Sequence, residues 1–130
     1  MDSSDGIQVV ALLAAVGLGF VAAFQLLIAL GAPVGRASWG GTHEGVLPTN
    51  LRLASGGAVF VWVAAGLVIL GRADLGPLSG WSVRWAAWVI VGVLVLGTVV
   101  NAASKSPWER FGWAPFILVL AVLCAVVASS

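Results

Sequence analysis

Four long apolar runs, separated by shorter polar segments rich in glycine and proline, dominate the pattern of this chain. They cover residues 7–30, 53–70, 83–101 and 111–128, the third having its uninterrupted part between Trp85 and Val100. Each run is long enough to cross the hydrocarbon core of a bilayer as an α-helix. Helices satisfy their own backbone hydrogen bonds in lipid, and the runs lack the strict alternation of a barrel strand. The pattern predicts an all-α integral membrane four-helix bundle, with residues 1–130 forming a single transmembrane domain.

The first run is predicted to be a retained span. Asp2 and Asp5 precede it and no Lys or Arg does. A cleaved signal peptide needs a basic segment before a shorter apolar core.

Composition supports a membrane protein and excludes several other classes. Of 130 residues, 61% are hydrophobic and 8% charged, and the mean hydropathy is +1.10. The basic residues are scattered singly, which excludes a nucleic-acid-binding footprint. The single cysteine, Cys124, provides neither a disulfide nor a metal site. No cofactor or metal motif is present, and no residue set identifies a catalytic centre.

The distribution of Lys and Arg predicts the orientation. Two basic residues, Arg72 and Arg84, flank the spans on the side of the termini, and four lie on the other side: Arg36, Arg52, Lys105 and Arg110. The positive-inside rule then places the first and third loops in the cytoplasm. We expect a multi-pass protein of the plasma (inner) membrane with both termini outside. Trp81, Trp85 and Trp88 follow a helical spacing that places indole rings at the outer interface.

Small residues on the first run predict a helix contact. They recur at every fourth position: Ala11, Ala15, Gly19 and Ala23. Helices associate closely in membranes where small residues let their backbones approach. The ridge predicts a seam either within the bundle or across a homodimer axis.

Polar side chains gather at the cytoplasmic ends of the spans and predict a vestibule there. The candidate ligand-binding residues are Gln25, Arg36, Trp39, His43, Asn101, Glu109, Arg110 and Trp113. Gln25 and Asn101 would orient a ligand, Trp39 and Trp113 would stack on it, and His43 or Glu109 would act as acid or base. Each has a simpler alternative: the amides as interhelical hydrogen-bond partners, His43 as an ordinary surface residue, and Glu109 and Arg110 as groups that meet headgroups and water.

The first loop, about 20 residues long, exceeds the usual length of a helix connection. Gly31, Pro33 and further glycines lead to Pro48, which precedes the second helix. We expect this loop to fold back over the mouth of the bundle with Trp39 as its anchor.

The loops also carry a resemblance. The first contains Ala29-Leu30-Gly31-Ala32-Pro33-x-Gly35-Arg36, then Trp39-Gly40-Gly41, Leu47-Pro48 and Leu51-Arg52, and the third contains Ser104, Ser106, Glu109, Arg110, Trp113 and Pro115. These segments resemble the corresponding loops of small four-span bacterial membrane proteins. The resemblance covers most of the chain, and it implies a fold but no activity.

Three function classes remain. The first is a non-enzymatic membrane module that self-associates or binds another membrane protein. The second is a binding protein or enzyme for a small amphipathic or lipidic molecule in the cytoplasmic-side vestibule. The third, a small oligomeric transporter or channel, ranks last because no span between its ends carries an ionisable residue of the kind that marks ion pathways.

Overall fold

Four helices long and apolar enough to cross a membrane make up the computed structural model, which describes residues 3–80 and 84–130. The helices are α1 (Ser3–Ala29), α2 (Thr49–Arg72), α3 (Arg84–Ala102) and α4 (Ala114–Ala128), and the fourth membrane-length segment, Glu109–Ala128, includes the turn that precedes α4. The α1–α2 connection contains two short 3-10 turns, η1 (Gly35–Ala37) and η2 (Trp39–Gly41), and a π-helical turn, η3 (Glu109–Trp113), leads into α4. The predicted fold class is confirmed. Trp81 and the predicted start of the third span at residue 83 lie outside the described residues.

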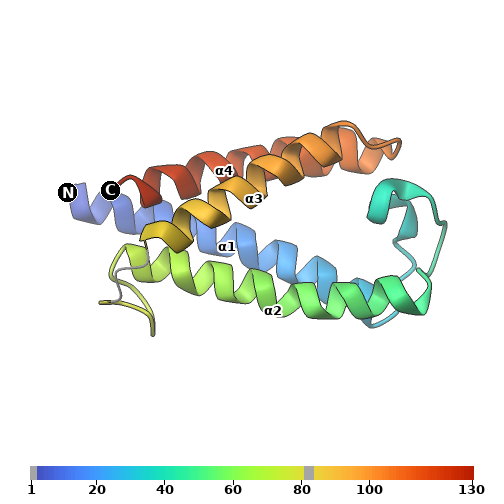
Figure 1. The fold of residues 1–130 in the computed structure, drawn as a ribbon, viewed down its shortest axis with the longest axis horizontal. Helices are drawn as coiled ribbons and strands as arrows, with labels where there is room; N and C mark the ends of the chain where they lie inside the picture. Colours follow the sequence, from blue (N-terminus) through green and yellow to red (C-terminus); the bar gives the residue numbers. More distant parts are fainter. Residues whose placement is uncertain (1–2, 81–83) are drawn as a thin grey trace.

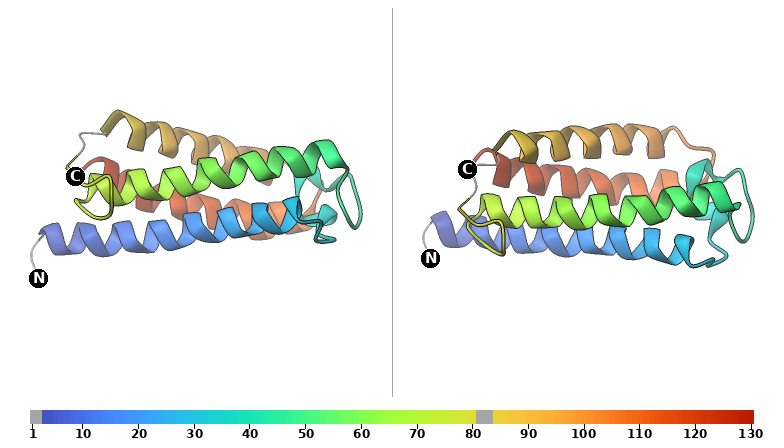
Figure 2. Two further views of the ribbon diagram at one scale, coloured as in Figure 1. Left: turned by 90° about the horizontal axis from the view of Figure 1, so that it is seen from below. Right: turned by 60° about the horizontal axis from the view of Figure 1, so that its bottom comes forward.

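The helices run side by side in two closely packed pairs. α1 packs along α2, and α3 packs along α4, with both termini at one end (Figure 1). Two further views show that all four helices run along the long axis of the molecule (Figure 2). We call the end with the termini and the α2–α3 connection the terminal end, and the end with the α1–α2 and α3–α4 connections the loop end.

Backbone turns close the ends of the first two helices. After α1, Gly31 adopts a φ of 97°, and the Ala32 N–H donates to the Leu27 carbonyl oxygen over 2.9 Å. After α2, Asp74 has a φ of 60°, and the Leu75 N–H donates to the Leu70 carbonyl oxygen over 2.9 Å. Such left-handed residues let a helix bond its last carbonyl groups. Near a membrane this matters because few other donors are at hand.

Two long polar side chains join α1 to α2 at opposite ends of the pair. Gln8 donates from Nε2 to the Ala73 carbonyl oxygen over 3.2 Å at the terminal end. Arg52 donates from Nη2 to the Ala29 carbonyl oxygen over 3.2 Å at the loop end. Arg52 also places a positive charge beside the C-terminus of α1, where the helix dipole is negative.

The closed core of the bundle occupies its terminal half. On α1 the positions that belong to the core cluster alternate between spacings of three and four, the 3.5-residue period that keeps one seam facing its neighbours in a left-handed bundle. These positions are Ala11, Ala14, Leu18 and Val21. The core residues that meet them are Ala65 and Ile69 of α2, Ala87, Val91 and Leu94 of α3, and Leu120, Ala121, Cys124, Val127 and Ala128 of α4.

The small-residue ridge of α1 leaves this seam after its first turns. Ala11 is fully buried and Ala15 partly buried, whereas Gly19 and Ala23 are exposed. Residues spaced by four rotate about 40° further round a helix at each step, so a ridge with this spacing cannot follow a seam with a 3.5-residue period. Gly19 and Ala23 therefore lie off the seam within the bundle. Their role across a homodimer axis stays a prediction.

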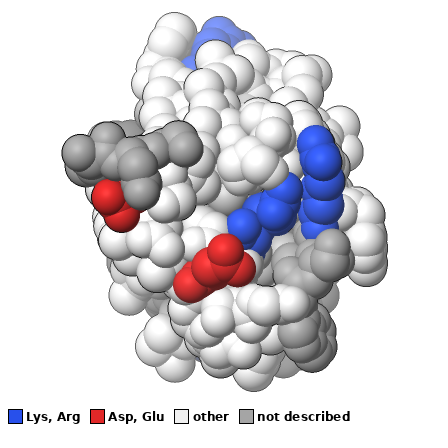
Figure 3. Space-filling view, turned by 90° about the vertical axis from the view of Figure 1, so that its left-hand side faces the viewer, with Lys and Arg blue, Asp and Glu red and all other residues white. Residues whose placement is uncertain are grey.

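Charged side chains lie at the two ends of the bundle. At the terminal end, Asp5, Arg72, Asp74 and Arg84 are the described ones. Figure 3 shows this end with charges of both signs on a largely uncharged surface. The long sides of the bundle are accordingly left to apolar residues, as contact with lipid requires.

Leucine in place of Ala14 distinguishes the seam from the ridge. Ala14 is 0% exposed, so Ala14→Leu is expected to overpack the core and to lower the free energy of unfolding by about 1–3 kcal/mol. Thermal unfolding in mild detergent, followed by circular dichroism, measures this change.

Ala23→Leu is the matched control, since Ala23 is exposed on the same helix. We expect its unfolding temperature to stay within experimental error of the wild type. An equal loss of stability in both variants would contradict the assignment of the seam.

Candidate functional site

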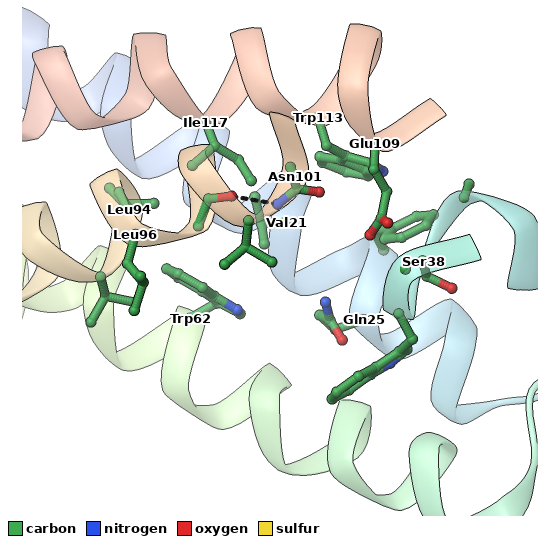
Figure 4. Close-up of a pocket in the computed structure, with 17 residues that line it drawn as sticks. Val21, Gln25, Ser38, Trp62, Leu94, Leu96, Asn101, Glu109, Trp113 and Ile117 are labelled. Carbon is green, nitrogen blue, oxygen red and sulfur yellow. Dashed lines mark hydrogen bonds between the residues drawn. The ribbon is translucent and has the colours of Figure 1, made fainter. Parts of the chain in front are cut away.

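A cavity of about 620 Å³ opens at the loop end, beyond the closed core. This volume lies within the usual range for a small-molecule site. The walls come from all four helices, η3 and the first loop (Figure 4). The lining residues are Val21, Phe24, Gln25, Ala37, Ser38, Trp39, Gly40, Trp62, Val93, Leu94, Leu96, Gly97, Val100, Asn101, Glu109, Trp113 and Ile117.

The cavity lies where the inward-facing rows of α1 and α3 change from apolar residues to polar ones. On α1 the row continues from Val21 to Gln25, and on α3 from Leu94 through Thr98 to Asn101. Amides pack poorly into an apolar core because each needs hydrogen-bond partners. The two helix pairs diverge toward this end in Figure 1.

Gln25 presents an unsatisfied acceptor in this region. Its Oε1 atom is buried and has no hydrogen-bond partner among the described residues. A buried polar atom left unpaired costs about 1–3 kcal/mol, and most such atoms in native proteins have a partner. Gln25 therefore calls for a donor from a bound molecule or from water.

The Asn101 amide nitrogen forms a hydrogen bond within its own helix. Its Nδ2 donates to the Gly97 carbonyl oxygen over 2.7 Å (Figure 4), as Thr98 Oγ1 does to the Leu94 carbonyl oxygen over 2.9 Å. These bonds run back along α3 and hold both side chains against their own helix. Asn101 then faces the cavity with a fixed amide plane.

The first loop covers this end of the cavity, as the sequence predicts. The indole Nε1 of Trp39 donates to Oγ of the fully buried Ser55 on α2 over 2.9 Å. On the opposite side, Ser106 Oγ donates to the Arg36 carbonyl oxygen over 2.5 Å. The loop thus joins the start of α2 to the α3–α4 connection. Trp39 adopts a φ of 49°, an unusual conformation for a bulky residue that these contacts hold in place.

Gly41 is the residue that permits this close approach. A Cβ at position 41 would lie 2.6 Å from the Cβ of Ser106, and the residue has a φ of 70°. Both the space and the backbone conformation require glycine.

Glu109 brings a carboxylate to the cavity from η3. The residue is 9% exposed, and Ser104 Oγ donates to its Oε1 over 2.6 Å. The Ser106 N–H donates to the same Ser104 hydroxyl oxygen over 3.0 Å, and the Glu109 N–H donates to Ser106 Oγ over 3.3 Å. These contacts form a capping box in which the Ser104 hydroxyl stands between the carboxylate and the backbone. The start of a helix favours such a negative charge.

Aromatic rings form much of the remaining wall. The Trp113 ring lies 4.6 Å from that of Phe24, 6.0 Å from that of Phe20 and 5.8 Å from that of Phe116, measured between centroids. These contacts bind α1 to α4 and fix the orientation of the Trp113 indole. Trp62 on α2 is partly buried, packs against the core and lines the cavity.

The structure brings together five of the eight predicted ligand-binding residues: Gln25, Trp39, Asn101, Glu109 and Trp113. The other three, Arg36, His43 and Arg110, have exposed side chains and do not line the cavity. His43 Nδ1 pairs with Thr42 Oγ1 over 3.1 Å. Arg110 donates from Nη2 to the Ser104 carbonyl oxygen over 2.9 Å and lies 5.9 Å from the Phe111 ring centroid. The structure therefore does not place His43 as an acid or base in this cavity.

Sequence reasoning missed Trp62 and Ser38. From the sequence, Trp62 is interpreted as a packing residue in the middle of a span. However, Ser55, Trp62 and Ile69 are spaced seven residues apart, which places them on one face of α2. That spacing is a signal that Trp62 faces inward. For Ser38, a buried residue of an irregular loop, we find no such signal in the sequence.

A second, apolar hollow of about 350 Å³ lies between α2 and α3. It shares Trp62 and Val93 with the larger cavity, and its other lining residues are Val61, Ala64, Ala65, Val68, Trp85, Ala86, Val89 and Ile90. α2 and α3 contact each other far less than α1 contacts α2. The apolar hollow between α2 and α3 therefore adjoins the cavity through these two shared residues.

Over residues 3–80 and 84–130, no group of three or more His, Cys, Asp or Glu lies close enough to hold a metal ion. Comparison of the chain with models of known protein families, with curated proteins and with solved structures found no match.

The hydrogen bond between Trp39 and Ser55 predicts that Trp39 anchors the first loop, and a substitution of Ser55 tests this. Ser55→Ala leaves the indole N–H without its acceptor, at a cost of about 1–3 kcal/mol. We expect the loop to open more often, so that trypsin cleaves after the exposed Arg36 roughly 5- to 100-fold faster. Mass spectrometry of the digest follows the cleavage.

Thr42→Ala serves as the control, because it removes a hydroxyl from an exposed pair in the same loop. Its cleavage rate should match that of the wild type. Equal rates in Ser55→Ala and the wild type would contradict an anchoring role for Trp39.

Proposed function

We propose that this protein binds a small amphipathic or lipidic molecule in the cavity at the loop end. The observation that carries the proposal is the buried Gln25 Oε1, an acceptor without a donor beside a cavity of suitable volume. Its walls combine polar groups, among them Asn101 and Glu109, with a larger apolar and aromatic surface. An amphipathic molecule has a polar group and an apolar part, which match these two kinds of wall.

Binding without catalysis fits this lining better than an enzyme does. Glu109 is the single ionisable side chain among the described residues that line the cavity. Acid–base catalysis commonly uses a second group placed against the first. Gln25, Asn101 and the indoles supply hydrogen bonds and contact area, which serve recognition.

We further propose that the loop end faces the cytoplasm and that the protein lies in the plasma membrane with both termini outside. Arg36, Arg52, Lys105 and Arg110 belong to the loop end, whereas Arg72 and Arg84 belong to the terminal end. The excess of positive charge at the loop end supports this orientation.

The apolar hollow between α2 and α3 supports a route from lipid. It shares Trp62 with the cavity wall, and its own surface is apolar along its length. A molecule with an apolar chain would keep that chain in contact with hydrocarbon or apolar side chains while its polar group reached Gln25.

Self-association is the second candidate function. Gly19 and Ala23 are exposed on α1, and a Cβ at Gly19 would meet nothing within 4 Å. That surface leaves room for the close approach of another helix, from a second copy or from another membrane protein. A transporter or channel remains the third candidate.

Replacing the cavity amides tests the binding proposal. We expect Gln25→Leu and Asn101→Leu each to abolish the retention of a bound small molecule, because the ligand's polar group loses its partners. Native mass spectrometry of protein extracted in mild detergent reads both the mass of the protomer and any retained molecule.

Gln8→Leu is the matched control, since Gln8 lies on the same helix and donates to Ala73 outside the cavity. It should keep the extra mass. Wild-type protein that carries no discrete extra mass would overturn the proposal, as would a mass retained equally in both amide variants.

Cysteine labelling tests the orientation. Ser79 at the terminal end and Lys105 at the loop end are exposed, whereas the native Cys124 is buried. In intact cells, a membrane-impermeant maleimide is expected to label Ser79→Cys and to label Lys105→Cys only after permeabilisation. The reverse pattern would place the loop end outside.

A further inference from the structure

We infer that the polar group of the bound molecule is a cation that carries N–H donors, as in a protonated alkylamine. This inference rests on the proposed function and assigns the chemical class of the ligand. Three features of the cavity carry it: its charge, its aromatic walls and the kind of hydrogen-bond partner that it lacks.

The charge of the cavity is negative. Glu109 lines it and is 9% exposed, and its side chain extends from the start of the fourth helix toward the side of Ser38 and Gln25 (Figure 4). None of the described lining residues is Lys or Arg. A carboxylate shielded from water attracts a cation more strongly than an exposed one does, because less solvent screens it. An anionic ligand would meet repulsion in the same place.

The hydrogen bonds of Glu109 leave its charge in place. Ser104 Oγ donates to Oε1, and the Ser104 oxygen in turn accepts from the Ser106 N–H. These partners are neutral, so they orient the carboxylate without neutralising it. Arg110, the next residue, directs its guanidinium to the Ser104 carbonyl oxygen and is exposed.

The aromatic walls suit a cation as well. Trp39, Trp62 and Trp113 all line the cavity, and Phe24 lies against Trp113. The faces of these rings carry partial negative charge and attract ammonium groups, tryptophan most strongly. The same rings accept the apolar part of the molecule.

The unpaired Gln25 Oε1 specifies a donor. An amide oxygen accepts hydrogen bonds only, as a carboxylate oxygen does. A protonated amine offers up to three N–H donors on one positively charged centre. A quaternary ammonium ion would match the charge and the rings but would leave Gln25 unsatisfied.

Three amphiphiles with the same eight-carbon chain test the charge: octylammonium, octanol and octanoate. Equilibrium dialysis against the full chain in phosphatidylcholine nanodiscs, with empty nanodiscs as the blank, gives the three affinities. We expect octylammonium to bind about tenfold or more tightly than octanol, as a hydrogen bond to a charged group would give, and octanoate to bind most weakly.

Glu109→Gln removes the charge and keeps an oxygen that can accept from Ser104. We expect it to reduce octylammonium binding to the level of octanol. Thermal unfolding of the variant, compared with that of the wild type, checks that the bundle is intact. Glu44→Gln is the matched control, since Glu44 is exposed and does not line the cavity, and it should bind all three as the wild type does.

The outcomes separate this inference from the proposed function. Equal binding of octanol and octylammonium to the wild type, or a preference for octylammonium that survives Glu109→Gln, overturns the cation inference and leaves a binding cavity. Failure of the wild type to bind any of the three overturns both.

Octyltrimethylammonium tests the requirement for N–H donors. It has the same charge and chain and no N–H group. We expect it to bind several-fold more weakly than octylammonium to the wild type. Equal binding of the two cations to the wild type overturns the N–H part of the inference.

Discussion

The exclusion of water from a bilayer is the constraint on which this structure depends. Inside hydrocarbon every backbone N–H and C=O needs a partner from the chain itself, so the four apolar runs become helices and the helix ends become the places where special conformations appear. Gly31 and Asp74 close α1 and α2 with left-handed residues. Arg52 and Gln8 bond carbonyl groups of the neighbouring helix. Among the described residues, Gln25 Oε1 and the Nε atoms of Arg52 and Arg72 are buried without a hydrogen-bond partner, and Gln25 is the residue of these three that lines the cavity.

Residue size divides the bundle into a closed half and an open half. At the terminal end the seam of α1 is built on alanines, which let the helices approach closely. At the loop end the same rows carry Gln25 and Asn101, and Trp62 and Trp113 stand on the facing helices. Bulky rings and amides hold these helices apart where small residues would let them close. The first loop then covers the opening through Trp39 and through the bond between Ser106 and the Arg36 backbone.

The position of Glu109 combines a structural and a chemical role. Its backbone N–H is bound by Ser106 and its carboxylate by Ser104, so it forms part of the start of the helical segment that leads into α4. The same carboxylate borders an aromatic cavity. A charge that a helix start stabilises costs less to bury than an isolated one, which explains how a small membrane protein keeps an acidic group in a largely apolar wall.

The sequence alone determined the number and helical nature of the spans, because apolar length in a bilayer leaves few other structures. It also indicated that Gln25, Trp39, Asn101, Glu109 and Trp113 belong to one end of the bundle. Only the tertiary structure decided which side chains face inward. Gly19 and Ala23 share a spacing with Ala11 and yet lie on the outer surface, since a four-residue period rotates around the helix away from the seam. Arg36 and Arg110 lie in the short turns η1 and η3, and His43 lies in an irregular part of the first loop. These segments are too short for a helical period to fix a direction before the bundle forms, and the three side chains are exposed. Periodicity assigns a face to a residue within a helix, but in a loop or at a helix start the face depends on contacts between segments far apart in the chain, such as those of Trp39 with Ser55 and of Ser106 with Arg36.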